Sequence, residues 1–345
     1  MQQKVLITGG TGFLGVHLAR KFLQEGWRVS LVDIAPLEAK DLAKKVTVIK
    51  ADVRNKKAVS QAVATATHVI HAAAALPIHR QKKIIFATNV SGTKNVLEAC
   101  LEHNVKRMIF ISSTAVYGIP KKVPETEETP LNPTGYYGQS KVAAEKLCRE
   151  YQTKGLEVTI LRPKTFLGPE RLGVFALWFE AIYSGHRVFI LGNGKNKYQL
   201  LAVSDISDAI YKATTSSVTN QTFNLGAKEF QTWRKDLRSI IRFDKSRAQI
   251  TSLPVIPSQL ILQILEFLHL SPLSAWHYKT LPVPSYVSID KAERLLHWHP
   301  RKSNQDLLLE NYLWYKQHRK AIQTRTGHTH RVSWNFKLLN LISHL

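Results

Sequence analysis

A tyrosine and a lysine four residues apart, Tyr137 and Lys141, are well suited to acid–base chemistry. At that spacing they share one face of a helix. A tyrosine hydroxyl titrates near about 10, too high for a base at neutral pH, and a nearby ammonium lowers its pKa. Ser113, 24 residues before Tyr137 in a hydroxyl-rich turn, can hydrogen-bond the same oxygen. These three residues could therefore take the proton from an alcohol that loses hydride.

A glycine-rich turn near the N-terminus is typical of a dinucleotide phosphate site. Gly9, Gly12 and Gly15 follow the apolar run 5–7 and precede a helical pattern, with the spacing G-x-x-G-x-x-G. The first glycine suits a tight turn, the second lets backbone approach a pyrophosphate, and the third lets the helix pack on the strand. The pyrophosphate would then meet free N–H groups at the positive end of a helix dipole.

Residues that end three further apolar runs could line the rest of such a site. Asp33 follows Gly15 by eighteen residues. Its carboxylate can bind the 2′-hydroxyl of an adenosine ribose and repel a 2′-phosphate, which favours NAD over NADP. The alternative is a turn or cap residue. Asp52 and Val53 end the third run, and the alanines 72–75 end the fourth, where small side chains would let a flat cofactor approach the backbone or would simply pack.

The elements that must position these residues have the pattern of an α/β protein. Short apolar runs alternate with helical patterns over residues 1–120, which predicts a doubly wound parallel sheet. Its strands are expected at 5–7, 29–32, 46–49, 69–71, 108–112 and 158–161. From about residue 165 the segments are irregular and rich in proline and aromatic residues. We therefore predict a Rossmann-type sheet with a smaller, mixed C-terminal lobe.

This pattern predicts three regions in the chain. Residues 1–165 form an NAD-binding Rossmann domain that carries the serine, tyrosine and lysine. Residues 166–320 form mainly a substrate-binding lobe, with returns to the Rossmann core. Residues 321–345 form a basic amphipathic tail. Ser303 and Asp306 are expected to cap a helix that runs to about residue 320.

The charge of the chain is unusual. The formal net charge is +23, and no acidic residue follows Glu310. A basic tail of this kind could contact an anionic membrane surface or nucleic acid, or it could be a solvated surface. An apolar stretch at 260–270 would suit a membrane contact or an entrance for an apolar ligand, and core packing is the other interpretation. Nucleic-acid binding is not the expected role, because it would depend on charge alone.

Composition restricts the class of protein further. Cys100 and Cys148 indicate neither a disulfide framework nor a metal cluster, so we predict a reducing compartment and no metal. No signal peptide opens the sequence, and no stretch reaches the ~18 apolar residues of a membrane span. The expected location is cytoplasmic, with peripheral membrane contact as an alternative.

Ten stretches of the sequence occur in the order known from one protein family. They are TGGTGFLG (8–15), Asp33, ADV (51–53), HAAA (71–74), NVSGTKNVLEAC (89–100), SSTAVYG (112–118), YYGQSK (136–141), LRPKTFLGP (161–169), VSDISDAI (203–210) and FNLG (223–226). The sequence resembles the extended short-chain dehydrogenases/reductases, the NAD-dependent epimerase/dehydratase superfamily, over roughly residues 4–320.

The resemblance implies a cofactor, a site and an assembly. The cofactor is NAD, and the site is lined by Gly9, Gly12, Phe13, Leu14, Gly15, Asp33, Asp52, Val53, Ala72, Ala73 and Ala74. Ser113, Tyr137 and Lys141 become the catalytic set, and Tyr137 and Lys141 also contact the cofactor. Helices that begin near Ser91 and Gly138 would form a homodimer.

Departures from the family pattern concern the substrate. Thr114 and Ala115 stand where nucleotide-sugar 4,6-dehydratases carry an Asp-Glu pair. Thr165 stands where nucleotide-sugar enzymes commonly have asparagine, and Tyr198 where they commonly have an arginine that holds the diphosphate. The aromatic lobe and the lost charge instead resemble the branch related to 3β-hydroxysteroid dehydrogenases.

We therefore predict an enzyme that transfers hydride between NAD and a secondary alcohol or ketone carbon. The small-molecule substrate would be steroid-like or sugar-like. A sugar or nucleotide-sugar epimerase that retains its NAD is one alternative, because it needs the same residues. A non-catalytic dinucleotide-binding regulator on the same fold is another.

Overall fold

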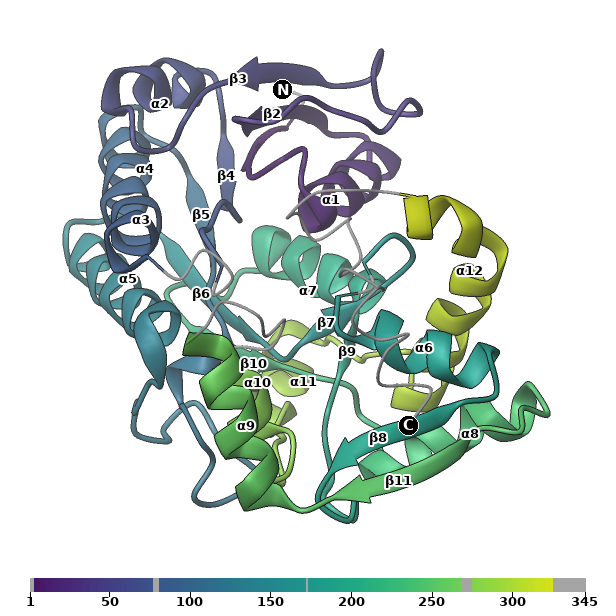
Figure 1. The fold of residues 1–345 in the computed structure, drawn as a ribbon. Helices are drawn as coiled ribbons and strands as arrows, with labels where there is room; N and C mark the ends of the chain where they lie inside the picture. The colour runs from purple at the N-terminus through teal and green to yellow at the C-terminus, as the bar shows by residue number, and fades with distance from the viewer. Residues whose placement is uncertain (1–2, 77–80, 172, 268–274, 325–345) are drawn as a thin grey trace.

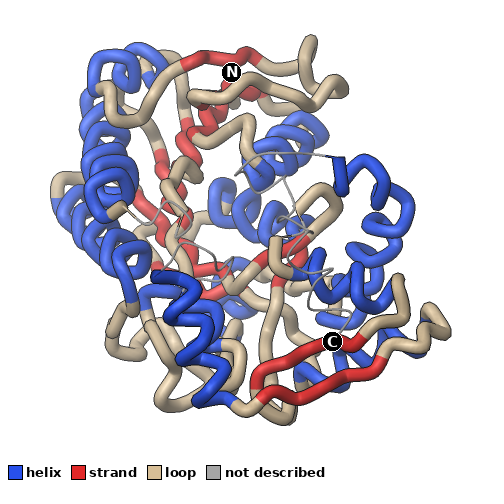
Figure 2. Tube along the Cα trace, in the orientation of Figure 1, coloured by secondary structure: helices blue, strands red, loops and turns tan. Residues whose placement is uncertain are grey.

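A seven-stranded parallel sheet forms the centre of the protein (Figures 1 and 2). The computed structural model describes residues 3–76, 81–171, 173–267 and 275–324. The strand order is β10-β6-β5-β4-β1-β2-β3, and every neighbouring pair is parallel. The strands are β1 (Lys4–Thr8), β2 (Arg28–Asp33), β3 (Thr47–Lys50), β4 (His68–His71), β5 (Arg107–Ile111), β6 (Val158–Pro163) and β10 (Thr222–Leu225). The first six confirm the predicted strands to within two residues.

Helices cover both faces of this sheet, as the apolar character of the central strands requires. One face packs against α1 (Phe13–Gln24), α7 (Val203–Thr215) and α11 (Asp290–Leu296). The other packs against α2 (Lys56–Val63), α4 (Gly92–Glu102) and α5 (Gly135–Thr153). Figure 1 shows α2, α4 and α5 stacked on one side of the strands and α1 and α7 on the other. The predicted Rossmann-type fold class is confirmed.

A second, mixed lobe has a core of its own. Its elements are α6 (Phe175–Tyr183), β8 (Arg187–Leu191), α8 (Trp233–Phe243), β11 (Gln249–Leu253), α9 (Val255–Phe267), α10 (Ala275–Thr280), α12 (Asn304–Thr324) and the short pair β7 (Phe166–Leu167) and β9 (Leu201–Ala202). Aromatic side chains pack among aliphatic ones in this core, and they include Phe179, Trp233, Tyr312 and Tyr315. Between β9 and α8 the chain returns to the main sheet as α7 and β10.

The last described helix is capped as its sequence predicts. Ser303 and Asp306 form reciprocal hydrogen bonds: Ser303 donates to the Asp306 carboxylate at 2.7 Å, and the Asp306 N–H donates back to Ser303 Oγ at 3.1 Å. Helix α12 continues past residue 320 to Thr324, because Ile322 is buried in the lobe core. The remainder of the predicted tail, 325–345, lies outside the described residues.

Helix α9 exposes an apolar face. Ile256, Leu260, Ile261 and Ile264 are between 51% and 80% exposed. Core packing, one of the two interpretations of this stretch, therefore does not account for these four side chains. Within the described residues, no helix combines the length and apolar character needed to cross a membrane.

A buried histidine links three elements beneath the carboxyl edge of the sheet. His71, at the end of β4, has one ring nitrogen 2.6 Å from Thr8 Oγ1 and the other 2.9 Å from Thr93 Oγ1. Burial lowers the pKa of His71 to about 3, and the Lys141 charge adds to the shift. The ring is therefore neutral in the folded protein at any pH near neutrality.

We expect the free energy of unfolding to fall as the pH drops below about 6.5. Burial also lowers the pKa of His17 and His68, to about 4. The unfolded chain then takes up protons that the folded chain does not, so stability is present at neutral pH and is lost on acidification. For His71 alone the loss between pH 7 and pH 5 is about 2 kcal/mol.

Urea unfolding at pH 7 and pH 5 measures this effect. The variant His71→Gln should lose about 2 kcal/mol less than the wild type over that interval. Equal losses in both proteins would show that His71 does not take up a proton on unfolding in this pH range.

Candidate active site

The carboxyl ends of the central strands bring the predicted site residues to one edge of the sheet. In the register, Thr8 of β1 is opposite both Val32 of β2 and His71 of β4, and Ile111 of β5 is opposite Leu161 of β6. The glycine turn, Asp33, the alanines after β4 and the Ser113 turn all follow these strand ends. In parallel α/β sheets, this edge is where ligands bind.

The glycine turn has the shape that a dinucleotide phosphate needs. Gly9 has φ +68°, and a Cβ on it would lie 2.8 Å from the Ala73 backbone nitrogen. A Cβ on Gly15 would lie 2.4 Å from Gly9 O, so α1 approaches the turn as closely as backbone permits. Helix α1 begins after Gly12 with no side-chain cap and no acidic residue in its first turn. No local side chain therefore caps the first N–H groups of α1, and these groups can donate to a phosphate.

Asp33 completes the fit to NAD at the end of β2. Its carboxylate accepts hydrogen bonds from the Thr11 N–H at 3.1 Å and from the Ala35 N–H at 3.2 Å. These bonds fix the carboxylate beside the glycine turn while its remaining lone pairs can accept from a ribose hydroxyl. The turn and the carboxylate together fit the cofactor that the sequence predicts.

The predicted cofactor residues Asp52, Val53 and the alanines 72–74 follow strands β3 and β4. Asp52 is held by Arg54, whose guanidinium lies 2.5 Å from the carboxylate. Val53 is buried where α4 begins: a Cβ on Gly92 would lie 2.8 Å from it, and Asn95 donates to the Val53 carbonyl at 2.9 Å. The alanines 72–74 are partly exposed after β4.

We expect Asp33→Ser to shift cofactor preference toward NADP. The variant loses a charged acceptor for the ribose hydroxyls and no longer repels a 2′-phosphate. Affinity for NAD⁺ should fall about 10- to 100-fold, while affinity for NADP⁺ rises relative to it. Calorimetric titration with both dinucleotides measures the ratio, with Asp41→Asn in an exposed ion pair as the control. An unchanged ratio would show that Asp33 does not contact the ribose.

Ser113, Tyr137 and Lys141 come together at the carboxyl edge of the sheet. Ser113 caps the short 3-10 helix η3 (Thr114–Val116), with its Oγ accepting from the Ala115 N–H at 3.1 Å. A side-chain hydrogen bond joins Ser113 to Tyr137. Lys141, one turn further along α5, donates to the Ile111 carbonyl at 2.8 Å, and its Nζ lies 5.9 Å from the Tyr137 ring centroid.

The electrostatics of this group differ in one respect from the sequence-based expectation. Burial raises the pKa of Tyr137, and the hydrogen bond with Ser113 and the charge of Arg171 oppose that rise. Burial lowers the pKa of Lys141 to about 8. The cation found to act on the tyrosine is Arg171, which the sequence analysis did not single out.

A buried polar network holds the elements behind the three residues. Arg162 on β6 forms two hydrogen bonds with Glu145 on α5, at 2.9 and 2.6 Å, and both side chains are fully buried. Glu145 also accepts from Ser112 at 2.7 Å, and Arg162 donates to Tyr117, which donates to Asn224 on β10. The network joins β5, α5, β6 and β10, so it fixes the Ser113 turn relative to the helix of Tyr137.

Asn89 is a further positioning residue that the sequence analysis missed. It lies in the π-helix η2 (Ala87–Ser91), a local irregularity that is frequent at functional sites. Its amide exchanges two hydrogen bonds with the backbone of Ala75, and it donates to Ser140, which in turn donates to the Tyr137 carbonyl. The stretch NVSGTKNVLEAC contains the signal, but the two partners appear only in the fold.

Tyr198, where nucleotide-sugar enzymes commonly have an arginine, belongs to the lobe core. It is 3% exposed, and its ring lies 5.8 Å from that of Trp233 and 5.3 Å from Lys164 Nζ. Lys164 is also buried and donates to Ser285 at 2.7 Å. Neither side chain is placed to meet a diphosphate from solvent.

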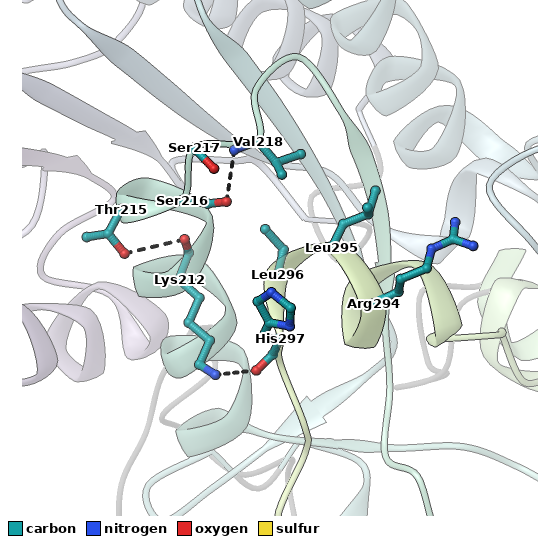
Figure 3. A pocket seen from close by; sticks show the side chains of 9 residues that line it. All are labelled: Lys212, Thr215, Ser216, Ser217, Val218, Arg294, Leu295, Leu296 and His297. Atoms are coloured by element: carbon teal, nitrogen blue, oxygen red, sulfur yellow. Dashed lines mark hydrogen bonds between the residues drawn. The ribbon is translucent and has the colours of Figure 1, made fainter.

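A surface hollow lies at the opposite edge of the sheet. It encloses about 530 Å³ and is lined by Lys212, Thr215, Ser216, Ser217, Val218, Arg294, Leu295, Leu296 and His297 (Figure 3). These residues lie at the end of α7, shortly before β10 begins, and at α11. None of the predicted catalytic residues, Ser113, Tyr137 and Lys141, lines this hollow, so it is separate from the candidate active site.

The sheet order, the glycine turn and the carboxylate after β2 define a Rossmann-fold dinucleotide-binding protein. The sequence model of the NAD dependent epimerase/dehydratase family matches residues 5–226, and the chain belongs to this family. The predicted family and the predicted NAD cofactor are thereby confirmed, and so is the prediction of an enzyme.

Three similar proteins illustrate the range of the family. The uncharacterized protein y4nG of Sinorhizobium fredii is 33% identical over 339 residues, which are 98% of this chain and 85% of that protein. Human sterol-4-alpha-carboxylate 3-dehydrogenase, decarboxylating, is 30% identical over 59% of this chain and 55% of its own length. The Thermus thermophilus UDP-glucose 4-epimerase, solved with NAD, is 25% identical, with a TM-score of 0.74 over 91% of this chain and 99% of that one.

Proposed function

We propose that this protein transfers hydride between NAD and a secondary alcohol or ketone carbon, with Tyr137 as the acid–base residue. The observation that carries the proposal is the convergence of Ser113, Tyr137 and Lys141 at the carboxyl edge of the sheet, the edge that also carries the glycine turn. The three residues come from the end of β5 and the first turns of α5, and their neighbours are held by the Glu145–Arg162 network.

Each side chain has a role that follows from its position. NAD, when bound, supplies the acceptor and donor of hydride. Tyr137 accepts the hydroxyl proton of the alcohol, and Ser113 hydrogen-bonds the same substrate oxygen. Lys141 is held by the Ile111 carbonyl with its Nζ 5.9 Å from the Tyr137 ring centroid, and the charge that lowers the pKa of Tyr137 is that of Arg171. Asn89 and Ser140 keep the start of α5 in place.

The proposed hydride transfer has two forms, which differ in what happens to the ketone. The ketone can leave, as in a dehydrogenase, or it can be reduced on its opposite face, as in an epimerase. The similarity to a UDP-glucose 4-epimerase over 91% of the chain supports the second form. The similarity to a sterol dehydrogenase and the buried Tyr198 support the first form, with an apolar substrate.

The test is NADH formation by purified protein with NAD⁺ and a panel of hydroxysteroids, free sugars and nucleotide sugars. A dehydrogenase gives NADH with one substrate class. An epimerase gives no net NADH, so the stereochemistry of each sugar is followed in parallel. Tight NAD binding with neither activity across the panel would favour a non-catalytic regulator.

We also propose a homodimer through α4 and α5. The proposal rests on the family resemblance and on the contact between these two helices along one side of the sheet. Partly exposed Ala143 on α5 and exposed Leu101 on α4 give these helices an apolar component at the surface. Light scattering of the eluting protein tests it: a mass near twice 39.1 kDa is expected, and the monomer mass would exclude it.

A peripheral contact with an anionic membrane surface is proposed for the exposed face of α9. Ile256, Leu260, Ile261 and Ile264 would enter the interface, and the net charge of +23 would favour anionic lipid. Sedimentation with vesicles containing anionic lipid should retain the wild type and release a variant with Leu260→Gln and Ile264→Gln. Equal sedimentation of both proteins would exclude α9 as the contact.

A further inference from the structure

Arg171 lies in an irregular turn next to the active site. The turn runs from Gly168 to Arg171, where the Arg171 N–H donates to the Gly168 carbonyl at 3.1 Å, and Glu170 within it has φ +77°. A positive φ is unusual for a residue with a side chain. The turn redirects the chain directly after β7, and it determines where the arginine side chain goes.

Two aromatic rings hold the guanidinium in place. Its central carbon lies 4.2 Å from the ring centroid of Phe166 and 5.5 Å from that of Phe13, and the two rings are stacked 6.2 Å apart. Arginine over aromatic faces at these distances is a favourable cation–π arrangement. Phe13 is the first residue of α1, so the cation is anchored beside the glycine turn.

The charge of Arg171 is available for an anion. Within the described part of the chain, none of the ion pairs involves Arg171, and its neighbour Glu170 acts on Arg20. Burial lowers the pKa of Arg171 to about 10, so it stays positive at neutral pH. The group on which its charge acts is Tyr137, whose pKa it lowers. Arg171 therefore lies between the phosphate end of the cofactor region and the reacting hydroxyl.

The position at which nucleotide-sugar enzymes commonly place a diphosphate-binding arginine does not supply a cation here. Tyr198 stands where an arginine commonly holds a diphosphate, and it is buried in the lobe core. Partly exposed Arg171 has a planar fork of N–H donors that matches phosphate and carboxylate oxygens.

We propose that Arg171 binds an anionic oxygen group, a phosphate or a carboxylate, of a ligand in the active site. The inference rests on the proposed function for the location of the site. Two sources could bring the anion: the pyrophosphate of NAD, and a diphosphate or carboxylate on the substrate. A neutral steroid-like substrate would leave the cofactor as the source.

The test measures binding at equilibrium, so it does not depend on turnover. NAD⁺ is titrated into wild type and Arg171→Met, and UDP and neutral uridine are then titrated into the NAD⁺-saturated proteins. The loss of a charge-assisted hydrogen-bonded contact predicts about 10- to 100-fold weaker binding of the anionic ligand. Arg171→Lys keeps the charge and loses the planar fork of donors, so its affinity for the anionic ligand should lie between those of wild type and Arg171→Met.

Each outcome decides the proposal. Weaker NAD⁺ binding alone assigns the anion to the cofactor, weaker UDP binding alone assigns it to the substrate, and loss of both assigns Arg171 to both. If NAD⁺ binds both variants within twofold of wild type and UDP shows no dependence on Arg171, the proposal is overturned.

Two controls complete the design. Arg294→Gln changes an arginine at the opposite edge of the sheet, in the hollow of Figure 3, and should leave both titrations unchanged. If Arg171→Met fails to fold, the comparison of Arg171→Lys with wild type decides in the same way. Failure of hydride transfer by the wild type would count against the proposed function and leave this binding result intact.

Discussion

Replacing Tyr137 with phenylalanine should lower turnover by about 10²- to 10⁴-fold, the usual contribution of one acid–base residue. The variant keeps the ring and loses only the hydroxyl that accepts the substrate proton. Affinity for NAD⁺ should change far less, because the glycine turn and Asp33 are untouched. Steady-state kinetics with the substrate that the panel identifies, combined with NAD⁺ titration, measures both quantities.

The neighbouring tyrosine provides a matched control. Tyr136 is 47% exposed and precedes Tyr137 on α5, so Tyr136→Phe makes the same chemical change outside the reacting group. It should keep turnover within about twofold of wild type, as expected of a surface substitution. If Tyr137→Phe behaved like Tyr136→Phe, the assignment of Tyr137 as the acid–base residue would be wrong.

Replacing Gly15 with alanine should abolish NAD binding and destabilise the fold. The new Cβ would lie 2.4 Å from Gly9 O and 2.5 Å from Gly10 Cα, and both are backbone atoms that cannot move without opening the turn. We expect affinity for NAD⁺ to fall more than about 100-fold, and overpacking of this kind commonly costs about 1–3 kcal/mol of stability. Calorimetry and urea unfolding measure the two effects.

Substitutions at two other glycines separate the effect on NAD⁺ affinity from the effect on stability. A Cβ on Gly12 would meet only Gly9 O at 3.1 Å, so Gly12→Ala should keep stability close to wild type and still impede a pyrophosphate. Gly155 has φ +93° and open space around it, so Gly155→Ala should lower stability by about 1 kcal/mol through backbone strain and leave NAD binding unchanged. Wild-type affinity for NAD⁺ in Gly15→Ala would show that the cofactor does not use this turn.

Periodicity and motif spacing were sufficient to predict the first six strands and the edge of the sheet at which the candidate site lies. Buried parallel strands form continuous apolar runs, and the loops that follow them must meet at one edge. The strand β10 was not predicted, because Asn224 interrupts the apolar run of Thr222–Leu225 and asparagine is uncommon in strands. Its identity as a strand depends on its pairing with β6.

Other features depend on contacts between residues distant in sequence. Arg171 reaches Phe13 through a turn with a positive φ at Glu170, which no propensity indicates. The exposure of Leu260 and Ile264 depends on how α9 lies on the lobe, and an amphipathic pattern does not distinguish an exposed apolar face from a buried one. The roles of Ser113, Tyr137 and Lys141 stay predictions until the variants are measured.

The return of the chain to the main sheet has a consequence for folding during synthesis. Strand β6 ends at Pro163, but its partner β10 begins only at Thr222, after the first lobe elements have been made. At about 5–20 residues per second, the edge of β6 stays unpaired for several seconds on the ribosome. A fragment that stops near residue 165 would also lack α7 and α11, and so would present to water the part of one apolar face that α1 does not cover. The nascent chain is therefore most prone to aggregation in this interval, when unpaired strand edges and uncovered apolar surface coincide.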